Sequence, residues 1–193
     1  MYRLFTATLL AAAVALPAAA ALHEGDSAPA FKTQASQAGK AFSYSLKDAL
    51  KKGPVVVYFY PSAFTNGCNI QAHTVAEKID AFRAAGATVV GVSLDSIKRL
   101  NEFSADPAFC AGKFPVAADL DGSIAKSFDL QIREIAAGRK DTRGIEIDHN
   151  AAERTTFVVT QDGRIAATVG GVDPAANVDK ALEAVQKLAA KKS

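Results

Sequence analysis

The chain has 193 residues, which is the size of one domain and enough to bury a substantial hydrophobic core. Its 22 basic and 20 acidic residues give a formal charge of +2, and the sequence contains no stripe rich in lysine and arginine. Charge therefore gives no reason to expect a nucleic-acid-binding protein.

The first 21 residues predict a secretory signal peptide. Arg3 is followed by an apolar run from Leu4 to Leu16, and small residues follow at positions 17–21. This order is typical of a cleaved signal, and the apolar run is too short to span a membrane comfortably. We therefore expect residues 22–193 to form a single domain in a bacterial periplasm, where disulfides persist. An N-terminal anchor that stays attached is the alternative.

The segment before the central strand predicts short elements at the edge of a sheet. Phe31 marks an edge strand, residues 35–41 predict a turn because they contain glutamine, serine and glycine, and the alternating apolar residues of 42–46 predict a second strand. Ser45 or Asp48 is expected to cap a single helical turn after that strand.

The central feature is a buried strand that leads into a cysteine. Residues Val55–Tyr60 are all β-branched or aromatic, which predicts a fully buried strand, and the polar residues that follow predict a turn. Val75, Ile79 and Phe82 then lie on one helical face. We therefore expect Cys68 in the first turn of a helix, where unpaired amides and the helix dipole stabilise a thiolate.

The rest of the chain predicts an alternation of strands and helices. In chain order we expect a helix that ends near Ala85, a strand at 88–94, a helix to about Ser104, an irregular segment at 105–113, a strand at 114–118, a short helix at 123–128, a hairpin at 155–169 and a last helix from Asn177. Residues 133–153 show no clear period and predict a loop or an exposed hairpin. The strand, helix, strand order favours parallel neighbours and hence an α/β protein.

Pro61, Thr65 and Cys68 form a Pro-x-x-x-Thr-x-x-Cys pattern directly after the buried strand. In this setting the pattern resembles the active-site loop of the peroxiredoxins, and especially of their bacterioferritin comigratory protein (PrxQ) branch. Residues 88–95, 114–128 and 154–165 resemble the family in the expected order, so that the resemblance covers most of the chain from about Gly25 onward. It implies a thioredoxin-like α/β fold with a central mixed sheet flanked by helices. It also implies a thiol-dependent peroxidase that needs no metal, flavin or haem.

The resemblance further implies a role for each residue around the cysteine. Cys68 would be the peroxidatic cysteine, whose thiolate attacks one peroxide oxygen. The Thr65 hydroxyl and the backbone N–H groups of Gly67 and Cys68 would bind the peroxide, while Pro61 would shield the thiolate from water. Arg154 would hold both the thiolate and the peroxide with its fixed fork of donors.

The second cysteine, Cys110, leaves three interpretations open: an unreacted thiol, a static disulfide with Cys68, or a resolving thiol. Its segment contains proline, alanine and glycine, so we expect it to be accessible rather than part of the core. In many PrxQ-like proteins the resolving cysteine lies five residues after the reactive one, but here that position holds His73. Cys110 resembles the resolving cysteine of a second PrxQ subgroup, and we expect this disulfide to require local unfolding of the first helical turn and the Cys110 segment.

The expected reactants are hydrogen peroxide or an organic hydroperoxide and a dithiol electron donor, either a thioredoxin-like protein or a small thiol. No nucleic acid and, after signal cleavage, no stable membrane association is expected. The alternative is a different class, a periplasmic thioredoxin-like thiol-disulfide or copper-binding assembly protein. That class is disfavoured because Cys-x-x-Cys is missing and because His23, His73 and His149 lack metal-ligand spacing.

Overall fold

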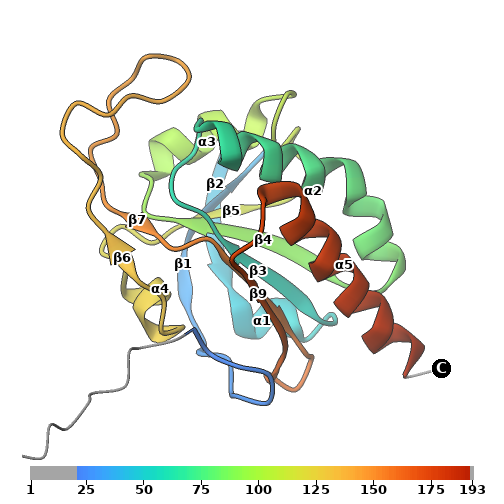
Figure 1. The fold of residues 1–193 in the computed structure, drawn as a ribbon. Coiled ribbons are helices and arrows are strands. Elements are labelled where there is room, and N and C mark those ends of the chain that lie inside the picture. The colour runs from blue at the N-terminus through green and yellow to red at the C-terminus, as the bar shows by residue number, and fades with distance from the viewer. Residues whose placement is uncertain (1–20, 192–193) are drawn as a thin grey trace, which may run out of the picture.

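Within residues 21–191, which the computed structural model describes, seven strands form one mixed β-sheet (Figure 1). The strands are β1 (Lys32–Gln37), β2 (Lys40–Ser45), β3 (Val55–Phe59), β4 (Thr88–Ser93), β5 (Val116–Ala118), β8 (Thr155–Val159) and β9 (Ile165–Gly170). Their order is β2-β1-β5-β4-β3-β8-β9, in which β3, β4 and β5 run parallel and the other neighbouring pairs are antiparallel. The predicted mixed central sheet is confirmed. The predicted signal peptide lies outside the described residues, apart from Ala21.

Helices cover both faces of the sheet, and each face has its own apolar cluster. The helices are α1 (Leu46–Leu50), α2 (Asn66–Ala84), α3 (Ile97–Ala105), α4 (Ser123–Ser127) and α5 (Pro174–Ala190). On one face α2, α3 and α5 pack against side chains such as Val56 and Tyr58, and Figure 1 shows α2 beside α5. On the other face α1 and α4 pack against Val57 and Phe59. Successive residues of β3 therefore enter opposite clusters, as a strand with two buried faces requires.

The position of β3 in the sheet explains why its sequence is apolar throughout. It pairs with β4 on one side and with β8 on the other, and all five of its residues are buried. The predicted buried strand is therefore confirmed. Its carboxyl end opens directly into the loop that precedes Cys68.

The prediction of a turn at residues 35–41 is wrong. β1 continues through Gln37, and the chain reverses only at residues 38–39. Ser36 is fully buried in this strand, and its hydroxyl lies 2.8 Å from that of Ser104 in α3. Ser104, in a helix far along the chain, thus provides a hydrogen-bond partner for buried Ser36, a residue type that favours turns in the absence of such a partner.

The last helix begins at Pro174 and not at Asn177, where the sequence predicted its start. Asp173 caps it, because its carboxylate accepts hydrogen bonds from the N–H groups of Ala175 and Ala176. Proline suits the first helical position, since its missing N–H would have no acceptor there.

Residues 134–150, called here the β6–β7 segment, project from the body of the molecule (Figure 1). The segment joins two short antiparallel strands, β6 (Ile132–Arg133) and β7 (Ala151–Ala152). A further antiparallel bridge pairs Lys140 with Glu146 inside it. Of the two predicted alternatives, the exposed hairpin describes this region.

Candidate active site

Cys68 lies at the start of α2, where the chain emerges from β3. The helix begins at Asn66, so the cysteine falls in its first turn as predicted, and its side chain is buried. The N–H groups of Gly67 and Cys68 have no acceptor inside the helix, because the first turn of a helix lacks preceding carbonyls. The side chain of Thr65, the N-cap residue, makes no capping hydrogen bond, so these donors stay available to a ligand.

Pro61 and Thr65 belong to the loop between β3 and α2, called here the active-site loop (residues 61–65). The Thr65 hydroxyl donates to the Ser62 carbonyl at 2.8 Å, which fixes its side chain. Together with Gly67, Pro61 and Thr65 line one wall of a cleft of ≈ 740 Å³. The β6–β7 segment contributes the opposite wall, so of the residues that the sequence suggested, Pro61, Thr65 and Gly67 line the cleft, whereas Cys68 and Arg154 do not.

Arg154, the residue before β8, reaches the cysteine sulfur. Its Nη2 lies 3.4 Å from Cys68 Sγ, and its Nη1 donates a hydrogen bond to Gln71 Oε1. Gly67 permits this approach, because a Cβ built there would lie 3.1 Å from Arg154 Nη2 and 3.3 Å from Pro174 Cγ. The structure thus brings together Cys68, Gly67 and Arg154, which are far apart in sequence.

A buried amide network, which the sequence did not predict, orients this arginine. Gln71 Nε2 donates to Asn177 Oδ1 at 3.0 Å, and Asn177 Nδ2 donates to the Val169 carbonyl at 2.9 Å. Gln71 and Asn177 are both buried, so each amide is held in one orientation. The only sequence signal is the spacing of Gln71 three residues after Cys68, which places both on one side of the helix.

The active-site loop contains a strained residue that the β6–β7 segment holds in place. Phe64 has a φ of 61°, a left-handed conformation that costs free energy for a bulky side chain. Its carbonyl accepts hydrogen bonds from the Thr142 N–H at 2.9 Å and the Thr142 hydroxyl at 2.8 Å. The Arg143 guanidinium lies over its ring, 3.3 Å from the centroid. The polar and charged residues of this segment therefore include direct partners of the active-site loop.

Asp95, which follows β4, forms the centre of a second polar cluster beneath the loop. Its carboxylate accepts hydrogen bonds from the Ala63 N–H at 2.8 Å and the Ser62 hydroxyl at 3.2 Å. His149 Nε2 lies 2.8 Å from one of its oxygens, and Arg99 Nε lies 2.8 Å from the same atom. His149 belongs to the β6–β7 segment, so this buried carboxylate joins that segment to the active-site loop.

Burial and hydrogen bonding have opposite effects on the pKa values of Asp95 and His149, and the hydrogen bonds and paired charges together have the larger effect. Burial alone would raise the pKa of Asp95, but hydrogen bonds from His149, the Ala63 N–H and Ser93 hold it below its usual value. Burial alone would lower the pKa of His149, but its hydrogen bond to Asp95 and the charge of Asp95 raise it above 6.5. The pair is therefore stabilised as an imidazolium with a carboxylate.

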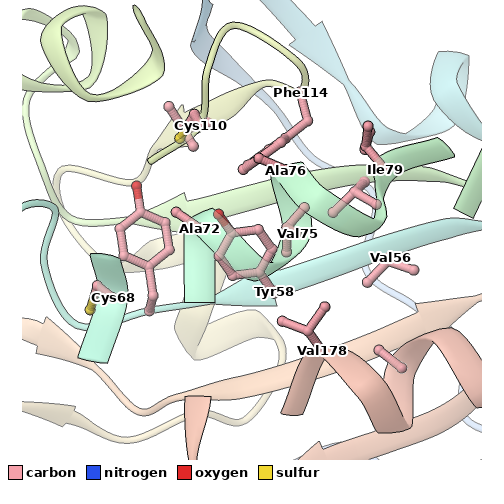
Figure 2. Packing of buried hydrophobic residues seen from close by; sticks show 14 of the residues in the cluster. Val56, Tyr58, Cys68, Ala72, Val75, Ala76, Ile79, Cys110, Phe114 and Val178 are labelled. Atoms are coloured by element: carbon pink, nitrogen blue, oxygen red, sulfur yellow. The ribbon is translucent and has the colours of Figure 1, made fainter. Parts of the chain in front are cut away.

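Cys110 is fully buried, which corrects the expectation that its segment is accessible. The segment after α3 folds back through hydrogen bonds to Asp106, and Phe109 packs on Phe103 with ring centroids 5.4 Å apart. Burial, and then the charge of Asp106, raise the pKa of the Cys110 thiol well above its ordinary value. Figure 2 shows Cys68 and Cys110 at separate places in one apolar cluster, and both thiols are free.

Within the described part of the chain, no three histidine, cysteine, aspartate or glutamate side chains are grouped closely enough to hold a metal ion. Among residues 21–191, no helix has the length and apolar character needed to cross a membrane.

Comparisons with known proteins show the family of this chain. Residues 25–168 match the family model described as the AhpC/TSA family. The chain is 32% identical over 132 residues to peroxiredoxin Bcp of Xanthomonas campestris, which covers 68% of this chain and 76% of that protein. It is 31% identical over 111 residues to peroxiredoxin Bcp of Escherichia coli, covering 58% and 64% of the two chains.

Solved structures show the same fold. Peroxidoxin BcpB of Mycobacterium tuberculosis superposes with a TM-score of 0.71 at 25% identity, covering 86% of this chain and 98% of that one. The bacterioferritin comigratory protein of Xanthomonas campestris, solved to study its alkyl peroxide reduction activity, superposes with a TM-score of 0.63 at 28% identity, covering 81% and 91%.

Proposed function

Because this chain belongs to the AhpC/TSA family and is a thiol-dependent peroxidase, we propose that Cys68 is its peroxidatic cysteine and Cys110 its resolving cysteine. The observation that carries the first assignment is the contact between Arg154 Nη2 and Cys68 Sγ at 3.4 Å, at the start of a helix and beside a cleft. The thiolate is the reactive form of a cysteine, and a guanidinium and open helix amides are groups that can donate hydrogen bonds to it.

In the first step the Cys68 thiolate attacks one oxygen of the hydroperoxide. The S–O bond forms as the O–O bond breaks, so sulfur is oxidised to a sulfenic acid and the leaving hydroxide or alkoxide takes a proton. Charge moves from sulfur to the leaving oxygen during this step. We expect Arg154 and the open amides of Gly67 and Cys68 to stabilise charge on both atoms. Thr65 donates its hydroxyl proton to the Ser62 carbonyl, so its hydroxyl oxygen is left to accept a hydrogen bond from the hydroperoxide O–H. Pro61, which lines the same wall of the cleft, is expected to limit the access of water.

In the second step the Cys110 thiolate attacks the sulfenic sulfur of Cys68. The disulfide forms, hydroxide leaves as water after protonation, and a dithiol donor then reduces the disulfide. The donor is a thioredoxin-like protein or a small thiol. Burial of Cys110 raises its pKa and keeps it away from Cys68, so the first turn of α2 and residues 106–113 must open before the second step.

The assignment is tested by mixing reduced protein with less than one equivalent of hydrogen peroxide in a stopped-flow instrument, followed by intact mass measurement. Wild type should consume peroxide rapidly and lose about 2 Da as the disulfide forms. Cys110→Ser should remain fast but accumulate sulfenic or over-oxidised protein, whereas Cys68→Ser should be slow. If Cys68→Ser reacts as fast as wild type, the peroxidatic assignment is wrong.

We also propose that residues 1–21 direct the protein to the periplasm and are removed there. The order of charged, apolar and small residues supports this location. Expression of the full chain in a Gram-negative host, followed by periplasmic extraction and N-terminal sequencing, should recover protein that begins at Leu22. Recovery of the full-length chain in the cytoplasmic fraction would contradict the proposal.

A further inference from the structure

The cleft beside the active-site loop has two walls of different character. One wall contains Pro61, Thr65 and Gly67, and Gly67 directly precedes Cys68 in the chain. The opposite wall comes from the β6–β7 segment and the ends of its flanking strands, with apolar side chains (Ile135, Ala136, Ile147, Ala151) and charged ones (Arg133, Glu134, Arg139, Lys140). At ≈ 740 Å³ the cleft is far larger than hydrogen peroxide needs.

The wall formed by the β6–β7 segment carries basic side chains that form no ion pair. Arg133, Arg139 and Lys140 are exposed, and no ion pair joins any of them to an acidic residue of the described chain. The lining also contains Asp141, but its carboxylate already pairs with Arg99 and Arg143 at 2.9 and 3.1 Å. Glu134 is the one remaining acidic side chain on this wall.

The two arginines provide the stronger part of this charge. Lys140 pairs across the segment with Glu146, whose carboxylate accepts a hydrogen bond from the Gly138 N–H at 3.0 Å, so an acidic group lies near the lysine. No acidic residue lies opposite Arg133 or Arg139 in this way, since Arg133 pairs with Ala151 and Arg139 accepts a backbone hydrogen bond from Ile147. A guanidinium also offers two parallel donors that match a carboxylate.

The wall is held against the active-site loop and does not hang free. Asp141 pairs with Arg99, Thr142 binds the Phe64 carbonyl, and His149 binds Asp95, so the middle and the C-terminal end of the β6–β7 segment are tied down. This part of the cleft wall is therefore ordered before a substrate arrives, which lowers the entropy lost on binding.

We propose that this cleft binds an organic hydroperoxide that carries a carboxylate group, with Arg133 and Arg139 as the carboxylate-binding residues. The inference rests on the proposed function, because the peroxide end of the substrate must reach Cys68. The hydroperoxide group lies near Thr65 and Gly67, the carbon chain packs on Ile135 and Ile147, and the carboxylate meets the arginines. Each part of the substrate thus meets groups of matching chemistry.

The test compares two substrates that differ only in charge, a carboxylic acid hydroperoxide and its methyl ester. The rate of reaction with reduced protein is measured by stopped flow in single turnover, without any electron donor. Wild type should react several-fold faster with the acid than with the ester at low ionic strength, and the difference should shrink in 0.5 M salt. Equal rates for acid and ester at low salt would overturn the proposal.

The variant Arg133→Gln/Arg139→Gln removes the two charges while retaining polar side chains. It should lose roughly threefold to tenfold of its rate with the acid, since each partly exposed ion pair contributes modestly. Its rates with the ester and with hydrogen peroxide should stay within about twofold of wild type. Lys187→Gln changes an exposed residue of α5 that does not line the cleft; it is the matched control and should show wild-type rates with all three substrates.

The outcomes separate this inference from the function on which it rests. If wild type reduces no hydroperoxide rapidly, the proposed function fails. If it reduces hydrogen peroxide and both organic substrates but the double variant slows them equally, only the carboxylate site fails. If the double variant reacts normally with every peroxide and is slow only when a dithiol protein reduces its disulfide, the cleft binds the electron donor and the proposal is overturned.

Discussion

Arg154 is the one cationic side chain that the described structure brings to the Cys68 sulfur, and its two nitrogens have different partners. Nη2 faces the sulfur at 3.4 Å, while Nη1 binds Gln71, whose other amide atom is held by Asn177. A guanidinium can make both contacts at once because its donors are fixed in one plane. A lysine would have to abandon one of them.

Arg154→Lys should therefore slow the reaction with hydrogen peroxide by about 10²-fold, the range measured when one preorganised donor is removed from an active site. The measurement is stopped flow with reduced protein, with circular dichroism to confirm folding. Arg164→Lys changes an exposed arginine of the β8–β9 turn and should leave the rate unchanged. A rate for Arg154→Lys within threefold of wild type would show that the sulfur does not need the guanidinium.

Gly67→Ala should have opposite effects on the stability of α2 and on the position of the Arg154 guanidinium. Alanine is the better helix former by roughly 0.5–1 kcal/mol, so propensity alone predicts a more stable protein. Its Cβ would however lie 3.1 Å from Arg154 Nη2, so the guanidinium must move. We expect the melting temperature to hold or rise while the peroxide rate falls about tenfold. In the Arg154→Lys variant, Gly67→Ala should slow the reaction with peroxide only slightly further, because the guanidinium that it displaces is already absent. If the rate losses of the two substitutions multiply in full, Gly67 does not act through Arg154.

His149 and Asp95 together give stability a dependence on pH. The raised pKa of His149 adds stability that is complete below about 6.5 and is lost as pH rises through the folded-state value. The lowered pKa of Asp95 adds stability that is present above 3.8 and is lost as pH falls towards the folded-state value. The pair should therefore contribute most between about pH 4 and 6.5.

His149→Gln should lower the free energy of unfolding more at pH 5.5 than at pH 8.5, because it removes the charged pair but keeps a donor near Asp95. Urea unfolding at the two pH values measures the difference. His23→Gln, at an exposed position before β1, should show no such contrast. The same loss of stability for His149→Gln at both pH values would mean that packing and not charge accounts for the role of His149.

At the scale of elements, the two cysteines lie in segments that can open independently of the sheet, as the proposed disulfide requires. Cys68 lies in the first turn of α2, and Cys110 lies in the loop after α3. Neither segment contributes a strand to the sheet, so both can unfold without breaking its ladder. The core strands β3 and β4 should remain protected in every redox state.

Hydrogen exchange measured by mass spectrometry should therefore be faster in the disulfide form at residues 66–70 and 106–113 than in the reduced form. Peptides from β3 and β4 serve as the internal control and should exchange equally slowly in both forms. Cys110→Ser treated with the same peroxide should retain the reduced-state protection, because no disulfide can form. Equally slow exchange around Cys68 and Cys110 in reduced and oxidised protein would refute local unfolding.

The sequence predicted these elements well where local pattern and burial agree. Val55–Phe59 and the cysteine at the following helix start were predictable because a buried strand, a turn and a helical period succeed one another. The burial of Cys110 was not predictable, since the apolar cluster that contains Cys110 is assembled from residues far apart in the sequence. The Asp95–His149 pair was also missed, because a contact between residues 54 positions apart has no local pattern.

For the whole molecule, the two faces of the sheet have unequal roles. The cluster under α2, α3 and α5 contains both cysteines, whereas the cluster under α1 and α4 contains neither. Phe103 in the first cluster and Phe128 in the second are each fully buried, which makes them a matched pair. Phe103 packs on Phe64 of the active-site loop with centroids 5.0 Å apart, and Phe128 packs on Phe157 at 5.0 Å.

Phe103→Ala and Phe128→Ala should each reduce the free energy of unfolding by about 3–5 kcal/mol, the range for removing a buried ring. Their effects on disulfide formation should differ. Phe103→Ala should speed the step from sulfenic acid to disulfide, since it loosens the packing that keeps the active-site loop and the Cys110 segment closed. Phe128→Ala should leave that rate near wild type, provided that both variants are measured at a temperature where they are folded. If the two variants change the rate of disulfide formation equally, this opening depends on global stability and not on the packing of one face.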